Sequence, residues 1–209
     1  PFSTFAKVSR GIATGANDFF KFNLSRARQY GIPEENLKPC ICHCVDVDGS
    51  FFSQADFEAL RDKDKYVFIF DGEGSKSQAV LNYIKKGEDD KCNEKFLTKS
   101  RNPWYALEKR APAPIWVSVF SRDKLNFIRN TSDATCLTTF HCIYPKENLF
   151  GSVSIEFLFA YLISNTARLI FLDNGREYGN GLRKFEPNDL NKGMMLDLRM
   201  LDEKVKQEI

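Results

Sequence analysis

The chain has 209 residues, and its 30 Lys and Arg nearly balance its 28 Asp and Glu, which gives a net charge of +2. This balance excludes a histone-like tail and a polyanion mimic, and 43% apolar residues with 13% aromatics exclude a disordered chain. No apolar run approaches the roughly 20 residues that cross a bilayer, and no basic-then-apolar leader opens the sequence. We therefore expect one globular domain, or two small ones, without membrane contact.

Six cysteines raise the questions of disulfides and metal. Three of them alternate with other residues as the side chains on one face of a strand do: Cys40, Cys42 and Cys44. Structural zinc ligands usually come in pairs within turns, so a zinc site completed by His43 with Cys142 or His141 is the weaker alternative. Free Cys is among the most buried residue types, which favours reduced core thiols, no metal and a cytoplasmic protein.

Hydrophobic periodicity and turn residues predict a mixture of strands and helices in the first half of the chain. We expect extended segments around 10–17, strand composition over 18–24, and a helix that Ser25 caps and Gly31 ends. The elements expected next are a strand at 40–47, a helix opened by 53–56, a strand at 66–70 and a helix at 77–86 stopped by Gly87.

The second half begins with a basic, aromatic stretch over 95–110 that contains residues typical of a loop. The elements expected after it are strands at 115–120, 124–129 and 136–144, an amphipathic helix at 153–165, a strand at 168–172, a Gly-rich segment at 174–181 and a charged helix from Asp202. This order predicts an α+β fold with a mixed sheet and flanking helices, a main body over 1–150 and a closing subregion over 151–209.

Three patterns resemble catalytic sites without their full chemistry. The Asp71-Gly-Glu-Gly-Ser turn follows an apolar strand as nucleotide-binding turns do, but it lacks the third glycine and a parallel βαβ partner. The tetrapeptide Asn102-Pro-Trp-Tyr105 is similar to the Asn-Pro-Pro-Tyr of amino-methyltransferases, but polar, basic residues precede it and the second proline is absent. The paired carboxylates lie in charge-rich loops, where solvation is the default interpretation. We therefore predict no catalytic residues in this chain.

The small net charge conceals an uneven distribution. Residues 95–130 carry eight cations against two acids, residues 1–30 carry five against one, and residues 54–94 carry ten acids against seven cations. A positive face with Trp104, Tyr105 and Trp116 among its cations is compatible with nucleic-acid binding, and equally with a solvated surface over core aromatics.

Three motifs in sequence order carry a family resemblance. They are the opening Arg10-Gly-Ile-Ala-Thr-Gly-Ala-Asn-Asp-Phe-Phe20, the central Thr98-Lys-Ser-Arg-Asn-Pro-Trp-Tyr105, and the closing Arg176-Glu-Tyr-Gly-Asn-Gly-Leu-Arg-Lys-Phe-Glu-Pro-Asn-Asp-Leu190. Together they resemble the C-terminal specificity domain of adenine-specific DNA methyltransferases from restriction-modification systems, over nearly the whole chain. The resemblance implies a target-recognition domain that chooses the DNA site for a catalytic domain expected upstream of Pro1.

The resemblance also implies S-adenosylmethionine as the cofactor of the parent protein, with no cofactor in this fragment, and methylation of adenine in duplex DNA after base flipping. Some relatives fuse a nuclease to the same chain. The implied partners are duplex DNA and the catalytic domain of the same polypeptide. A protein-interaction or scaffold domain with a basic docking face is the alternative function, and a nucleotide-binding enzyme using the turn near Gly72 comes third.

The predicted DNA contacts combine cations for phosphate or guanine with polar and aromatic side chains. The cations expected to contact phosphate or guanine are Lys99, Arg101, Lys109, Arg110, Arg122 and Lys124. Thr14 and Asn17 are possible polar contacts or a satisfied turn, and Lys184 is equally suited to docking the neighbouring domain. Trp104 is more readily a packing anchor than a stacking wedge. Arg10 and Tyr105 complete the predicted set.

Overall fold

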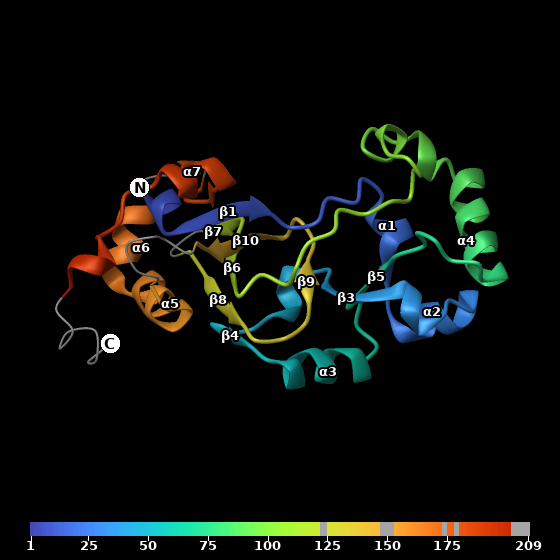
Figure 1. Ribbon diagram of the computed structural model, residues 1–209, viewed down its shortest axis with the longest axis horizontal. Coiled ribbons are helices and arrows are strands. Elements are labelled where there is room, and N and C mark those ends of the chain that lie inside the picture. The colour runs from blue at the N-terminus through green and yellow to red at the C-terminus, as the bar shows by residue number, and fades with distance from the viewer. Residues whose placement is uncertain (122–124, 147–152, 173–174, 178–179, 202–209) are drawn as a thin grey trace.

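The computed structural model describes residues 1–121, 125–146, 153–172, 175–177 and 180–201. Within these residues, seven α-helices and three β-sheets make an elongated molecule (Figure 1), which confirms the predicted α+β class. The predicted charged helix from Asp202 lies outside the described residues. No helix among the described residues is long and apolar enough to span a bilayer.

The largest sheet has the order β1-β10-β6-β8-β4. Its strands are β1 (Ala6–Arg10), β10 (Phe140–Pro145), β6 (Ile115–Ser118), β8 (Phe127–Asn130) and β4 (Phe51–Phe52). The neighbours pair antiparallel except β4 and β8, and the register of β1 on β10 puts Arg10 opposite His141. Ala6 and Val8 are buried while Lys7 is exposed, the alternation of a strand with one covered face.

The second sheet has the order β2-β5-β3-β9 and supports the helices between residues 17 and 89. Its strands are β2 (Lys21–Phe22), β5 (Phe68–Phe70), β3 (Leu37–Ile41) and β9 (Thr135–Cys136). The helices are α1 (Asn17–Phe20), α2 (Leu24–Tyr30), α3 (Gln54–Asp62) and α4 (Gln78–Asp89). Since β9 and β10 both lie within residues 135–145, one short stretch of chain joins the two sheets.

The remaining elements surround the end of the large sheet where β1 begins (Figure 1). They are the small sheet β11 (Arg176–Glu177), β12 (Arg183–Lys184) and β7 (Phe120–Ser121), with helices α5 (Ile155–Ile163), α6 (Asn165–Leu172) and α7 (Pro187–Lys192). Short 3-10 helices lie at Phe2–Thr4, Glu34–Asn36, Cys44–Asp46, Cys92–Glu94, Thr98–Ser100 and Leu198–Met200.

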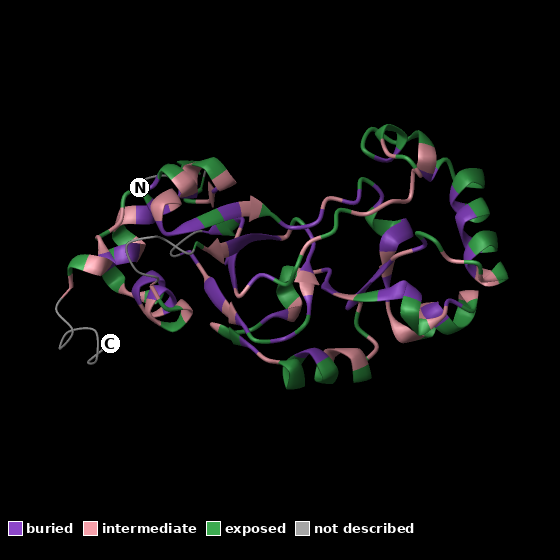
Figure 2. Ribbon diagram, viewed as in Figure 1, coloured by how far each residue is buried: buried purple, intermediate pink, exposed green. Residues whose placement is uncertain are grey.

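Two separate hydrophobic cores contain most of the described Phe side chains. The first core lies under the second sheet and contains Phe19, Phe20, Phe22, Phe70 and Tyr83. The second lies between the large sheet and α5–α7 and contains Phe2, Ile115, Phe127, Phe171 and Phe185. Buried segments of both appear along the whole molecule in Figure 2. Residues after 151 therefore share a core with the first strand of the chain.

Two predicted helix ends differ from the structure. Asn23, rather than Ser25, caps α2, because its side chain accepts from the Arg26 amide at 2.9 Å, while Gly31 ends the helix at φ +64° as predicted. Helix α4 runs through Gly87 to Asp89. A Cβ at Gly87 would lie 2.5 Å from a Phe19 ring carbon and 2.7 Å from Trp104, so this glycine permits close packing instead of ending the helix.

Three predicted strands are also wrong in part. Residues 165–172 form helix α6, in which Ala167 and Phe171 bury one face four residues apart and the Ser164 hydroxyl accepts from the Ala167 amide. The extended segment predicted at 40–47 ends at Ile41, and a 3-10 turn follows. Residues 17–20, predicted as extended, form α1.

The change of backbone after Ile41 separates the three alternating cysteines. Cys40 and Cys42 are buried whereas Cys44 is exposed, so the three do not share one face as the alternation predicted. All six thiols are free. In the part of the chain that the structure describes, no cluster of three His, Cys, Asp or Glu has the arrangement of a metal site.

Candidate nucleic-acid interface

A groove of about 580 Å³ lies between strands of the large and small sheets and the loop 13–17. One wall comes from β1, β7, β10 and β12, and the other comes from the loop 13–17 with Lys95 and Leu97. Its charged residues are the cations Arg10, Lys95 and Lys184 and the acid Glu186. Both walls thus contribute a cation, and the cations outnumber the acids among the described lining residues.

Glu186 holds the two cations of the first wall in place. One of its oxygens lies 2.9 Å from the Arg10 guanidinium, and the other lies 2.8 Å from Nζ of Lys184. The hydrogen bond from Lys184, together with that from Arg10, lowers the pKa of the Glu186 carboxyl. Because Arg10 is 61% exposed while Glu186 is only 21% exposed, the arrangement presents the Arg10 guanidinium rather than the carboxylate to solvent.

His141 lies buried behind this wall. Its Nε2 lies 2.7 Å from the Phe185 carbonyl, which can only accept, so Nε2 carries the proton and Nδ1 is left as an acceptor. Nδ1 has no partner among the described residues. Burial lowers the pKa of His141, and the ring is therefore neutral at neutral pH. This hydrogen bond fixes the residue that lies between Lys184 and Glu186 to strand β10.

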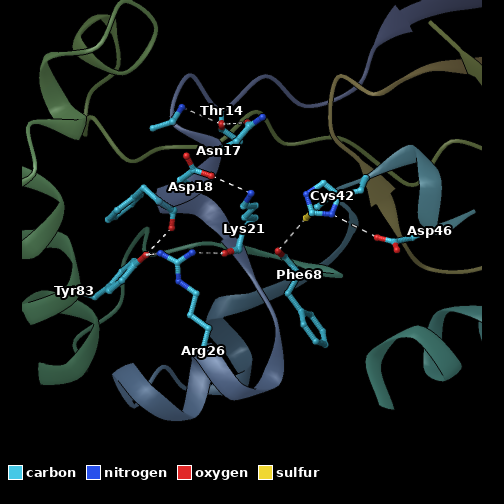
Figure 3. A network of polar contacts seen from close by, with 12 residues as sticks. Thr14, Asn17, Asp18, Lys21, Arg26, Cys42, Asp46, Phe68 and Tyr83 are labelled. Carbon is cyan, nitrogen blue, oxygen red and sulfur yellow. Dashed lines mark hydrogen bonds and ion pairs between the residues drawn. The ribbon is translucent and has the colours of Figure 1, made fainter. Parts of the chain in front are cut away.

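The loop of the second wall is held by its own side chains (Figure 3) and, from another part of the chain, by Arg101. The buried Thr14 hydroxyl accepts from the Ala16 amide at 3.1 Å and donates to Oδ1 of Asn17. The Arg101 guanidinium donates to the Thr14 carbonyl at 2.9 Å and also to the Ala13 carbonyl. Thr14 and Asn17 therefore form a satisfied turn at the groove, one of the two readings that the sequence left open.

Polar contacts behind the loop brace helix α1 (Figure 3). The Tyr83 hydroxyl donates to the Phe19 carbonyl at 2.6 Å and accepts from Arg26 at 2.9 Å. Arg26 also donates to the Lys21 carbonyl, and Lys21 pairs with Asp18 at 3.0 Å. Burial raises the pKa of the Tyr83 hydroxyl, so it remains a donor at neutral pH. The second wall is thus anchored to the first core.

Four of the predicted contacts line the groove: Arg10, Thr14, Asn17 and Lys184. The basic segment at 98–105 does not line it. Trp104 packs on Phe19 with ring centroids 5.0 Å apart, and its Nε1 donates to Glu88 at 3.1 Å. Tyr105 meets the Trp104 ring edge-on at 5.6 Å. Trp104 therefore packs as an anchor, the role that the sequence favoured over a wedge.

The other predicted cations lie elsewhere or outside the described residues. Lys109 pairs with Glu73 at 3.3 Å, while Arg110 pairs with Glu108 and donates to Oγ of Ser9 at 3.1 Å. Both line a different cavity of about 540 Å³. Nζ of Lys99 lies 5.9 Å from the Phe96 ring centroid. Arg122 and Lys124 fall outside the described residues.

Among the lining residues that were not predicted as DNA contacts are Lys95, Phe120, His141 and Glu186. Lys95 was counted in the basic segment, and Glu186 follows the predicted Lys184 within the closing motif, so both carried a signal. Phe120 was expected only as a strand residue, and His141 only as a candidate partner in the alternative zinc site. Only the pairing of β7 with β12 and of β1 with β10 brings them to the groove.

Comparison with known proteins identifies the family of this chain. Residues 1–209 match the model of the C-terminal domain of the type II methyltransferase M.Eco57I. The chain is 55% identical over its full length to the type II methyltransferase M.AccI of Acinetobacter calcoaceticus, of which it covers 39%. It is 25% identical over 89% of its length to the type II methyltransferase M.XamI of Xanthomonas campestris pv. amaranthicola, of which it covers 34%.

The fold also occurs in a solved structure. The type IIG restriction endonuclease BpuSI matches 97% of this chain with a TM-score of 0.57 and 16% identity, over 24% of its own chain. At this identity the match concerns the fold alone. Since the family model spans all 209 residues, the chain belongs to the family of the C-terminal domain of type II methyltransferase M.Eco57I.

Proposed function

We propose that this domain binds duplex DNA in the groove and chooses the DNA site for the methyltransferase to which it belongs. The observation that carries the proposal is the set of cations on both walls, Arg10 and Lys184 on one and Lys95 on the other. Neutralising phosphates with such cations releases counterions, which supplies most of the affinity for DNA. A groove with cations on both sides suits a ligand with two charged strands.

The two cations of the first wall have different uses. Arg10 ends a strand with its guanidinium largely exposed, and a guanidinium can form two parallel hydrogen bonds to the edge of a guanine. Lys184 is a point charge that suits a phosphate. Glu186 keeps both in position before DNA arrives, which reduces the entropy that binding costs.

The activity of the whole protein is part of the proposal, since the chain spans 39% of M.AccI. We infer a catalytic domain on the same polypeptide that uses S-adenosylmethionine and methylates adenine flipped out of duplex DNA. A restriction-modification protein of this kind works on chromosomal and invading DNA, which suggests the cytoplasm. The partners of this domain are then the duplex and the catalytic domain.

The test is fluorescence anisotropy of the 209-residue domain with a labelled duplex across a salt series. We expect affinity that falls linearly on logarithmic axes as salt rises. Removing one phosphate contact, by Lys95→Ala or Lys184→Ala, should reduce that slope by about one. The matched control is Lys63→Ala, an exposed lysine just after helix α3 that does not line the groove.

Two outcomes would contradict the proposal. Absence of binding at low salt removes the DNA function, and equal slopes for the groove variants and the control place the contact elsewhere. Sequence choice needs its own measurement, in which duplexes retained by the domain from a random pool are sequenced. A pool that stays random after several rounds would leave a DNA-binding domain without site recognition.

A further inference from the structure

The groove holds a large aromatic side chain that its phosphate chemistry does not require. Phe120 lines the groove beside the cations and is 51% exposed. Its neighbours Val119 and Ser121 are each only 7% exposed, so the strand turns these two inward and Phe120 outward. The ring therefore adds nothing essential to the second core, and it lies where a bound ligand would pass.

The pairing of β7 with β12 fixes the position of Phe120 beside Lys184. Phe120 lies directly opposite Lys184 in the antiparallel pair β7–β12, and the Phe185 amide donates to the Val119 carbonyl at 2.9 Å. Nζ of Lys184 lies 5.9 Å from the ring centroid. A phosphate-binding cation and an aromatic face are thus presented side by side from neighbouring strands.

Every nucleobase has an apolar face that stacks on aromatic rings, and each nucleotide carries such a face next to a phosphate. Proteins that bind duplex DNA also insert Phe side chains between base steps, which separates the bases and bends the duplex. We propose that Phe120 stacks on a nucleobase of the bound DNA while Lys184 neutralises a phosphate nearby. This inference rests on the proposed function, and it names the residue of the groove that touches bases.

The chain offers a matched control in Phe96. This ring is 81% exposed, and Nζ of Lys99 lies 5.9 Å from its centroid, the same distance as Lys184 from Phe120. Phe96 does not line the groove. Both are exposed Phe rings with a lysine Nζ at the same distance, and they differ in whether they line the groove.

The first experiment measures anisotropy of the domain with a duplex selected from the random pool. We expect Phe120→Ala to lower affinity by about tenfold, the size of one base–aromatic stack, and to leave the salt slope unchanged because no charge is removed. Phe120→Tyr keeps the ring and should bind as the unsubstituted chain does. Phe96→Ala should do the same. Circular dichroism verifies that each variant is folded.

The second experiment locates the stacked base. An abasic site is moved through the selected duplex one position at a time. At the contacted position it should weaken binding by the unsubstituted domain by about tenfold and leave binding by Phe120→Ala unaffected, since that variant has no stack to lose.

Equal affinities of Phe120→Ala and the unsubstituted chain for the duplex would overturn the inference and leave the proposed DNA function intact. That result would point to the catalytic domain as the partner of the Phe120 ring. Full affinity of Phe120→Leu would overturn stacking as the contact. Absence of salt-dependent binding by the unsubstituted chain is a different result, which removes the proposed function and the inference with it.

Discussion

The Arg101 guanidinium donates to the Thr14 carbonyl at 2.9 Å, although 87 residues separate them in sequence. With its second donor on the Ala13 carbonyl, Arg101 fixes the loop that forms one wall of the groove. Backbone carbonyls of a loop have no other partner once they are turned inward, and an unpaired one is costly. Arg101 therefore acts on the groove through the shape of the loop.

This role predicts the behaviour of Arg101→Ala. We expect the free energy of unfolding to fall by about 1–3 kcal/mol, because hydrogen bonds from a charged group are lost. In a domain of this size the melting temperature should drop by about 2–4 °C for each kcal/mol. Thermal denaturation followed by circular dichroism measures this. The salt slope of DNA binding should stay unchanged, whereas a slope reduced by one would make Arg101 a phosphate contact.

Gly87 lies in the last turn of α4 against two aromatic rings, and Gly87→Ala tests that contact. Alanine favours a helix by about 1 kcal/mol over glycine, but here its methyl would meet Phe19 and Trp104 at under 3 Å. Overpacking of this kind costs about 1–3 kcal/mol, so we expect net destabilisation in urea. Lys85→Ala on the exposed side of the same helix is the control and should unfold at nearly the unchanged urea concentration. A stabilised Gly87→Ala would contradict the tight packing.

His141 predicts a pH dependence of stability. Burial lowers its pKa in the folded state, so below its ordinary pKa of about 6.5 the unfolded chain binds a proton more readily than the folded chain. The contribution of neutral His141 to the free energy of unfolding is complete above this ordinary pKa. It is lost as the pH falls below it, by up to ~1.4 kcal/mol per pH unit. Urea unfolding between pH 8 and pH 5 measures the loss. The difference from His141→Gln should shrink over the same interval, and a constant difference would show that the ring does not titrate in this way.

Glu186→Gln should strengthen binding to DNA at low salt. The carboxylate offsets two groove cations, and its removal raises the positive potential that phosphates meet. The amide of residue 186 donates to the Asp189 carboxylate at 2.9 Å at the start of α7, and glutamine keeps this donor, so helix α7 should remain. We expect a gain of a few-fold in affinity for unrelated sequences and less discrimination among sites. The control is Glu156→Gln on α5, which removes a carboxylate that pairs with Arg129 on β8. A loss of affinity in Glu186→Gln would show that positioning of the two cations is the larger effect.

The sequence predicted the fold class and several elements because local signals and tertiary packing agreed there. Ser53 with Asp56 forms the capping box that opens α3, and Gly31 ends α2 with positive φ. The prediction failed where packing decided. Gly87 reads as a stop until Phe19 and Trp104 are known to cover it, and residues 168–172 have strand composition although Ser164 caps them as a helix.

The candidate site was predictable only in part, since counting cations does not reveal which of them have partners inside the protein. Arg101 and Arg110 belong to the most basic segment, yet both donate to carbonyls of residues 10–14. The groove cations that the sequence did single out, Arg10 and Lys184, come from the opening and closing motifs. Phe120 carries no local signal at all, because its position depends on a strand pairing over 64 residues.

The contact between His141 and Phe185 has a consequence for exchanging recognition between related domains. One hydrogen bond joins β10 to the segment that carries Lys184 and Glu186, and Arg10 reaches that segment from a third part of the chain. A graft of residues 183–186 alone would place these charged side chains beside the β1 and β10 strands of a different protein. Chimeras that redirect the domain to another site should therefore transfer strands β1, β10 and β12 together, as one inherited unit.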